Sequence, residues 1–134
     1  MLKPLRGYLL YAESLVVRPV DVPRALNFGP TDRQAVSVPD LVAYSGQVWN
    51  RLDGTVPVPN WQSKDEPRFA ETATLLLDSR LARDSLGWVS ILTWQEAVEM
   101  TFTWYERYQS GSHASELVAT QLDDHRTIVL ERTP

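Results

Sequence analysis

The sequence contains no cysteine, and this absence excludes both a disulfide framework and a zinc site built from thiolates. Only two histidines remain as soft metal ligands. His113 has no carboxylate at ligand spacing, and we expect it at the surface. His125 lies beside Asp123 and Asp124, and we interpret it as a helix-end cation near the C-terminal end of the helix dipole. We therefore expect no metal.

Long basic runs and long uninterrupted apolar runs are also absent. Thirteen Lys and Arg stand against seventeen Asp and Glu, which gives a net charge of −4, and no basic run occurs. Phosphate-backbone binding is therefore excluded as a main role, and we expect no nucleic-acid partner. The apolar N-terminal run is interrupted by Lys3, Arg6 and Glu13, so it predicts neither a signal peptide nor a membrane span. We expect a cytoplasmic protein without a membrane partner.

Two motifs of dinucleotide chemistry are missing. The sequence has no Gly-x-x-Gly-x-x-Gly or Gly-x-Gly-x-x-Gly turn to receive a pyrophosphate at a helix N-terminus. It also has no Tyr-x-x-x-Lys pair, in which a lysine one turn away lowers the pKa of a tyrosine base. None of the five tyrosines has such a lysine: Tyr8, Tyr11, Tyr44, Tyr105 and Tyr108. We therefore expect no cofactor in this chain and no catalytic residue.

The length and composition predict one compact unit. A chain of 134 residues is one domain, shorter than the roughly 250 residues that a dinucleotide domain and a substrate domain would need together. Hydrophobic residues make up 43% and charged residues 22%, which is close to globular averages. The expected fold class is α/β, mostly helical.

The strongest local signals run from Asp78 to Tyr108. Asp78 is a helix N-cap candidate, and Gly87 lies where a left-handed residue would end a short helix, Ser79 to Leu86. Thr93 and Glu96 form a capping box that opens a longer helix. One apolar face of this helix has three-and-four spacing: Trp94, Ala97, Val98, Thr101, Phe102, Tyr105 and Tyr108. We interpret these side chains, together with Trp88 and Trp104, as core.

Weaker signals complete the expected elements. Apolar stripes predict helices over Pro4 to Val16 and over Val38 to Asn50, the second capped by Ser37. A weak helical pattern covers Ser115 to His125. Ala25 to Phe28 is expected to be a short buried strand that Gly29 and Pro30 end, and Val56 to Trp61 an edge strand with two prolines.

A series of short motifs occurs in a defined order. The series comprises Leu2-Lys3-Pro4-Leu5-Arg6-Gly7-Tyr8-Leu9-Leu10, Asn27-Phe28-Gly29-Pro30, Trp49, Trp61 with Pro67 and Glu71, Leu77-Asp78, Leu86-Gly87-Trp88 and Thr103-Trp104-Tyr105. In this order the chain resembles the C-terminal part of extended short-chain dehydrogenase/reductases, within the NAD-dependent epimerase/dehydratase family. The resemblance is closest to nucleotide-sugar 4,6-dehydratases of the CDP-glucose type.

The resemblance implies a division of the chain and a set of binding residues. Residues 1–125 would be the sugar-nucleotide substrate-binding subdomain, without the Rossmann domain, and residues 126–134 are an unplaced tail. In the family, NAD and the tyrosine base belong to the Rossmann domain. The implied substrate-binding residues are Asn27, Phe28, Gly29, Pro30, Trp61 and Glu71. Family positions that carry His, Lys or Arg are here Ala70, Leu76, Ala73 and Thr74, so Lys64, Arg68 or Arg80 would have to supply charge for a pyrophosphate.

The sequence is compatible with three interpretations of the chain. In the first, the chain is the substrate-binding portion of a dehydratase, as an expressed fragment, a truncated reading frame or half of a split enzyme. In the second, it is a non-catalytic binding or interaction module derived from the family. In the third, it belongs to a nucleotide-sugar epimerase, although the spacing of Glu71 and the Asn27 to Pro30 motif favour the dehydratase.

The expected partners follow from the first reading. They are a nucleotide sugar of the CDP-glucose type and the missing Rossmann domain, in cis or in trans. Without that domain, water would meet apolar side chains such as Leu9, Leu10, Tyr11 and Phe28. We therefore expect a homo-oligomer.

Overall fold

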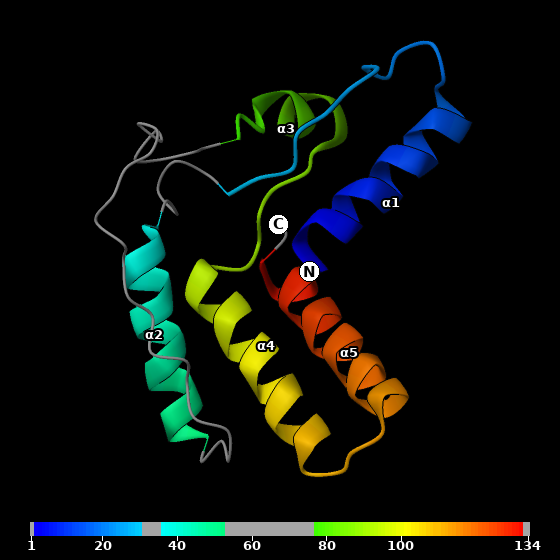
Figure 1. The fold of residues 1–134 in the computed structure, drawn as a ribbon. Helices are drawn as coiled ribbons and strands as arrows, with labels where there is room; N and C mark the ends of the chain where they lie inside the picture. The colour runs from blue at the N-terminus through cyan, green and yellow to red at the C-terminus, as the bar shows by residue number, and fades with distance from the viewer. Residues whose placement is uncertain (1, 31–35, 53–76, 133–134) are drawn as a thin grey trace.

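The computed structural model describes residues 2–30, 36–52 and 77–132, which contain five helices and no strand (Figure 1). The helices are α1 (Leu2–Val17), α2 (Val38–Arg51), α3 (Arg80–Leu86), α4 (Trp94–Gln109) and α5 (Ala114–Arg132). The mostly helical prediction is confirmed, whereas the described residues do not show the β part of the expected α/β class. The expected strand from Val56 to Trp61 lies outside the described residues.

The helices form two groups (Figure 1). α4 packs against α2 on one side and α5 on the other, and it runs parallel to α2 and antiparallel to α5. α1 packs against α3, and its first turns lie beside the last turns of α5. Residues 87–93 connect α3 to α4 and so join the two groups.

Local capping signals set the start of α4, as predicted. The Thr93 side chain accepts a hydrogen bond from the Glu96 backbone N–H at 3.2 Å, and the Thr93 N–H donates to Glu96 Oε2 at 2.7 Å. These reciprocal bonds satisfy donors that the first helical turn leaves free. At the other end, Ser110 is the C-cap and Gly111 has a φ of 97°.

The other predicted caps are confirmed, with one shift. Ser37 caps α2 by accepting from the Asp40 N–H, and Gly87 ends α3 with a φ of 65°. At the start of α3 the N-cap is Ser79, one residue later than predicted, and its side chain makes no capping bond. Asp78 still satisfies a free donor, since its Oδ1 accepts from the Arg80 N–H at 3.0 Å. The N-cap is therefore Ser79 and not Asp78, but Asp78 still accepts a hydrogen bond from the first turn.

The strand predicted from Ala25 to Phe28 is wrong. The segment has no regular secondary structure, and within the described ranges no strand lies beside it. A strand is defined by hydrogen bonds to a neighbouring strand, so apolar residues before Gly29 and Pro30 cannot form one without a partner. They instead pack by their side chains.

The sequence left the tail unplaced, and the structure assigns its first part to α5. Residues 126–132 continue this helix. Arg132 hydrogen-bonds the Ile91 carbonyl oxygen at 3.2 Å and Glu96 Oε1 at 2.6 Å. This contact ties the last turn of α5 to the start of α4, a tertiary interaction that the weak helical pattern did not contain.

Among the described residues, the core is shared between the two groups of helices. The buried apolar side chains are Val48, Trp49, Ala82, Trp88, Leu92, Val98 and Leu117. Trp88 is core, as predicted. Trp94 and Trp104 are only half-buried, and Tyr105 and Tyr108 are 50% and 51% exposed, so the assignment of these α4 side chains to the core is wrong.

The flanking helices explain the exposed tyrosines. α2 reaches one side of α4 through Trp49, which contacts Phe102, and through Tyr44, which bonds Glu99. α5 reaches the other side through Gln121, whose Nε2 donates to the Met100 carbonyl oxygen at 2.6 Å. Phe102 and Val98 of the predicted face are therefore covered, whereas Tyr105 and Tyr108 stay half exposed. A stripe of three-and-four spacing identifies one face of a helix, but it does not show that another element covers that face.

Among the described residues, no helix combines the length and the apolar composition that crossing a bilayer requires.

We predict that Thr93→Ala lowers the free energy of unfolding by about 1 kcal/mol, because it removes the acceptor of the α4 capping box. Thr93→Ser should retain most of that stability. Thr101→Ala is the matched control, since Thr101 is an exposed residue inside the same helix. Urea unfolding followed by circular dichroism measures all three variants. Equal losses at Thr93 and Thr101 would contradict the capping role.

Candidate functional site

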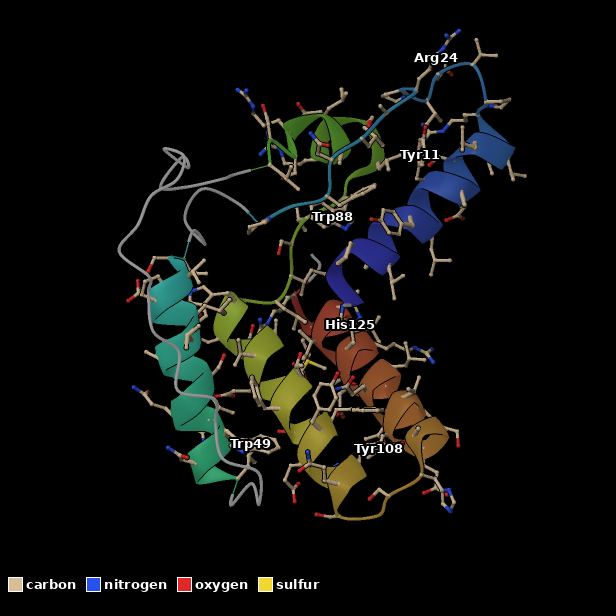
Figure 2. All side chains as sticks on the ribbon, in the orientation of Figure 1. Tyr11, Arg24, Trp49, Trp88, Tyr108 and His125 are labelled. Carbon is tan, nitrogen blue, oxygen red and sulfur yellow. The ribbon has the colours of Figure 1, made fainter. Side chains whose placement is uncertain are left out.

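Three aromatic rings from three separate segments meet where α1 approaches α3. The Phe28 ring lies edge-on to Tyr8 of α1, with centroids 5.4 Å apart, and edge-on to Trp88 after α3, at 5.2 Å. Such edge-to-face pairs are favourable beyond their burial. Trp88 is buried, and Figure 2 shows it between the extended segment before Pro30 and the start of α1. We call Tyr8, Phe28 and Trp88 the aromatic junction.

Two glycines allow the backbone to approach closely at the junction. A Cβ at Gly7 would lie closer than 3.0 Å to three atoms of the Phe28 ring. A Cβ at Gly29 would lie 2.8 Å from Leu77 Cβ. Any larger residue at either position would have to displace its neighbour. The segment Asn27 to Pro30 is therefore held between α1 and the residues that precede α3.

Four of the predicted substrate-binding residues, Asn27 to Pro30, lie in the segment that supplies Phe28 to the junction. Gly29 is buried and Phe28 is half-buried, whereas Asn27 and Pro30 are exposed. No hydrogen bond joins the backbone of Asn27, Phe28 or Gly29 to another part of the described chain. Backbone donors and acceptors normally find partners when they are partly buried. The segment is thus able to bind a ligand or a neighbouring chain through its backbone.

Arg80 follows shortly after the residue that contacts this segment, but its side chain is engaged. Leu77, which contacts Gly29, is three residues before it. The Arg80 guanidinium donates to both carboxylate oxygens of Asp78, with Nη2 to Oδ2 at 2.6 Å. This side-chain hydrogen bond lowers the pKa of Asp78 to about 2. Arg80 can serve a phosphate only by sharing or leaving this carboxylate. The other predicted site residues, Trp61, Lys64, Arg68 and Glu71, lie outside the described residues.

A polar network between α2 and α4 was not predicted. Tyr44 Oη donates to Glu99 Oε1 at 2.7 Å, and Arg51 Nη2 donates to the same oxygen at 2.9 Å. The Tyr44 hydrogen bond is the main reason that the pKa of Glu99 is lowered, and the bond to Glu99 in turn raises the pKa of Tyr44. The Tyr44 ring also lies edge-on to Trp94 at 5.1 Å. Forty-eight or more residues separate Glu99 from its two partners, so no local spacing could reveal the network.

A second network joins the ends of α4 and α5. Glu96 accepts from Thr93 and from Arg132, and the Arg132 hydrogen bond is the main cause that lowers the pKa of Glu96 to about 2. The capping box was readable from the sequence. The contribution of Arg132 was not, because it depends on α5 running to that residue.

A third polar region lies where α1 meets α5. Burial and the nearby Arg6 guanidinium lower the pKa of His125. Its expected role as a helix-end cation is wrong, because α5 continues for seven residues beyond it. Figure 2 shows His125 beside the first turns of α1. The buried Nη1 of Arg6 has no hydrogen-bond partner.

The exposed aromatic residues of α4 form a patch. Trp104 stacks on Tyr108 with centroids 5.1 Å apart and an interplanar angle of 14°. Tyr105 lies edge-on to Trp104 at 5.3 Å. We call these three residues the α4 aromatic patch. Their helical spacing predicted a place in the core, but their exposure makes them a contact surface.

At two helix N-termini of the described residues, side chains already bind backbone N–H groups. A dinucleotide pyrophosphate needs free backbone N–H groups at a helix N-terminus. At α2 the Ser37 side chain and at α4 the capping box already bind such donors. The same part of the chain contains no group of three or more His, Asp or Glu that could hold a metal ion.

No protein-family model, no curated protein and no solved structure matches the chain.

We predict that Gly7→Ala has opposite effects on stability in two backgrounds. In the wild type it should lower the free energy of unfolding by about 1–3 kcal/mol, since the added methyl overlaps the Phe28 ring. In a Phe28→Ala background the overlap is gone, and alanine should stabilise the helix by up to about 1 kcal/mol. Urea unfolding of the four proteins in this cycle measures the coupling. The same sign in both backgrounds would show that Phe28 does not require the glycine.

We also predict a stability loss in acid that depends on Arg132. A carboxylate with a lowered pKa stabilises the fold above its unfolded pKa, and that contribution disappears as protons bind the folded state. For Glu96 the window runs from about 4.5 down to about 2. Arg132→Met should flatten the fall of the melting temperature in this window, whereas Arg126→Met, at an exposed position of the same helix, should not. If the melting temperatures of the two variants changed with pH in the same way, the acid loss could not be attributed to the contact between Glu96 and Arg132.

Proposed function

We propose that this chain is the substrate-binding C-terminal portion of a nucleotide-sugar 4,6-dehydratase of the CDP-glucose type. In this proposal it holds the nucleotide sugar, and a separate Rossmann domain, in cis or in trans, supplies NAD and the tyrosine base. The chain is then not catalytically competent alone. In the family, NAD held by the Rossmann domain would supply the transient oxidation at the sugar C4 that precedes loss of water across C5 and C6.

One observation carries the proposal. Four of the motifs behind the family resemblance meet at one place, although they are spread over some eighty residues of the chain. Tyr8 of the first motif, Phe28 of the second and Trp88 after Gly87 form the aromatic junction, and Leu77 contacts Gly29 beside it. This clustering supports a common origin of the four motifs.

The chemistry of the junction suits a nucleotide sugar. The Asn27 to Gly29 backbone has donors and acceptors that are not used within the described chain, and hydroxyl groups of a sugar offer both. Asn27 adds an exposed side-chain amide. Phe28, which is half-buried, supplies apolar surface, and the buried Trp88 packs behind it. Binding pockets for small molecules commonly combine such walls with a few polar groups.

The test is a titration of the isolated chain with CDP-glucose and, separately, with NAD. CDP-glucose should bind. NAD should bind no more tightly than about 100 μM, or −5.5 kcal/mol, because a glycine-rich turn for its pyrophosphate is missing. Asn27→Ala should weaken CDP-glucose binding, and Asn50→Ala, an exposed asparagine on α2, is the matched control. Calorimetry measures each affinity.

Each other outcome rejects the proposal in a different way. NAD binding tighter than this limit would mean that the chain carries its own cofactor site. UDP sugars that bind as tightly as CDP-glucose would favour the epimerase reading. No response to any nucleotide sugar would leave the chain as an interaction module.

The α4 aromatic patch favours this last reading as a second candidate. Stacked aromatic side chains that are half exposed at a helix surface are suited to contact a ring or a partner protein. In that case Tyr105→Ala would remove binding of the partner, while Asn27→Ala would leave it unchanged.

A further inference from the structure

α1 has two apolar faces, and only one of them is covered. On the covered face Gly7 is buried, and Tyr11 is half-buried with its Oη donating to the Pro23 carbonyl oxygen at 2.8 Å. The opposite face carries four exposed apolar residues that we call the α1 seam: Leu5, Leu9, Ala12 and Val16. Leu5 is 48%, Leu9 72% and Val16 84% exposed. A contiguous apolar stripe on a helix is normally covered by another element.

The spacing of the seam identifies the kind of partner. Its four members follow one another at intervals of four, three and four residues, which is the heptad pattern of a coiled-coil contact. Such a pattern fits a second helix that lies nearly parallel to the first along its whole length. A flat or irregular partner surface would not require this heptad spacing.

The charges beside the seam identify the partner and its direction. Arg6 and Glu13 flank the same edge of the seam, seven residues apart, and Tyr8 and Leu15 flank the other edge. When two copies of α1 pair antiparallel, like edges face each other, so Arg6 of each copy meets Glu13 of the other. A parallel pair would place Glu13 opposite Tyr8 instead. Only the antiparallel arrangement matches the charges.

We propose that two copies of this chain associate through an antiparallel pairing of their α1 seams, flanked by two Arg6–Glu13 ion pairs. The contact is isologous, with a two-fold axis between residues 10 and 11. Leu5 then packs on Val16 of the second copy, and Leu9 on Ala12. Arg6 is half-buried, and its buried Nη1 has no hydrogen-bond partner within one copy, so a Glu13 carboxylate of the second copy would supply one. The proposal does not depend on the nucleotide-sugar function.

Sedimentation equilibrium of the full chain, without ligand, tests the association. The wild type should dimerise at tens of micromolar. Leu9→Lys should raise the dimer dissociation constant at least about tenfold, because each copy loses a buried leucine. Leu130→Lys is the matched control, since Leu130 is 70% exposed on α5, and it should have no effect. A wild-type chain that stays monomeric, or equal effects of the two lysines, would overturn the proposal and leave the seam to another partner.

Charge reversal tests the direction. Arg6→Glu and Glu13→Arg should each weaken the dimer roughly two- to tenfold, as expected for two surface ion pairs. The double variant should recover the wild-type affinity to within about threefold. Circular dichroism and the melting temperature verify that each monomer is folded. A double variant as weak as the worse single variant would overturn the pairing.

Single cysteines give a second measure of direction, and the chain has no native cysteine to interfere. In the antiparallel pair two copies of residue 5 lie about 16 Å apart along the axis, beyond the roughly 7 Å that a disulfide can span. The Leu5→Cys variant alone should therefore form little disulfide-linked dimer. A mixture of the Leu5→Cys and Val16→Cys variants should form a large fraction of disulfide-linked dimer. Efficient cross-linking of Leu5→Cys alone would indicate a parallel pair and overturn the proposal.

Discussion

The packing of Phe28 determines how the first part of the chain joins the rest. Its ring contacts the edges of Tyr8 and Trp88 and occupies the space that a side chain at Gly7 would need. One side chain therefore connects α1, the segment up to Pro30 and the end of α3. The groups proposed to bind a nucleotide sugar lie next to it, so their geometry depends on this packing and not on a regular sheet. Elsewhere, ion pairs at exposed helix ends contribute less, because solvent screens them.

Local signals in the sequence predicted the fold well where the responsible atoms are close along the chain. The Thr93 and Glu96 box, the Ser37 cap and the left-handed Gly87 each concern residues within one helical turn, and all three are confirmed. Burial was predicted less well. Tyr105 has the spacing of a core residue, but α2 and α5 cover the sides of α4 and leave it open. The sequence cannot show which helix neighbours which.

The candidate site shows the same division. The Asn27 to Pro30 motif was found from its order among other motifs, and it lies at the aromatic junction. The expected strand there is wrong, since pairing requires a neighbour that composition cannot reveal. Arg80 was proposed for its charge alone, and only the structure shows that Asp78 holds it. The Glu99 network with Tyr44 and Arg51 joins residues about fifty positions apart, and no periodicity predicts such a meeting.

The contacts of the aromatic junction, and the contact between Gly29 and Leu77, affect the order in which the chain folds. α4 and α5 are joined by four residues and can associate as a helical hairpin with little loss of chain entropy. The aromatic junction instead closes loops that span most of the chain, and its closure gains little until Trp88 is already positioned by α3. We expect the hairpin to form early and α1 to dock late. A nascent chain would therefore expose the α1 seam and the Phe28 ring together, at the stage when chaperones and like chains compete for apolar surface.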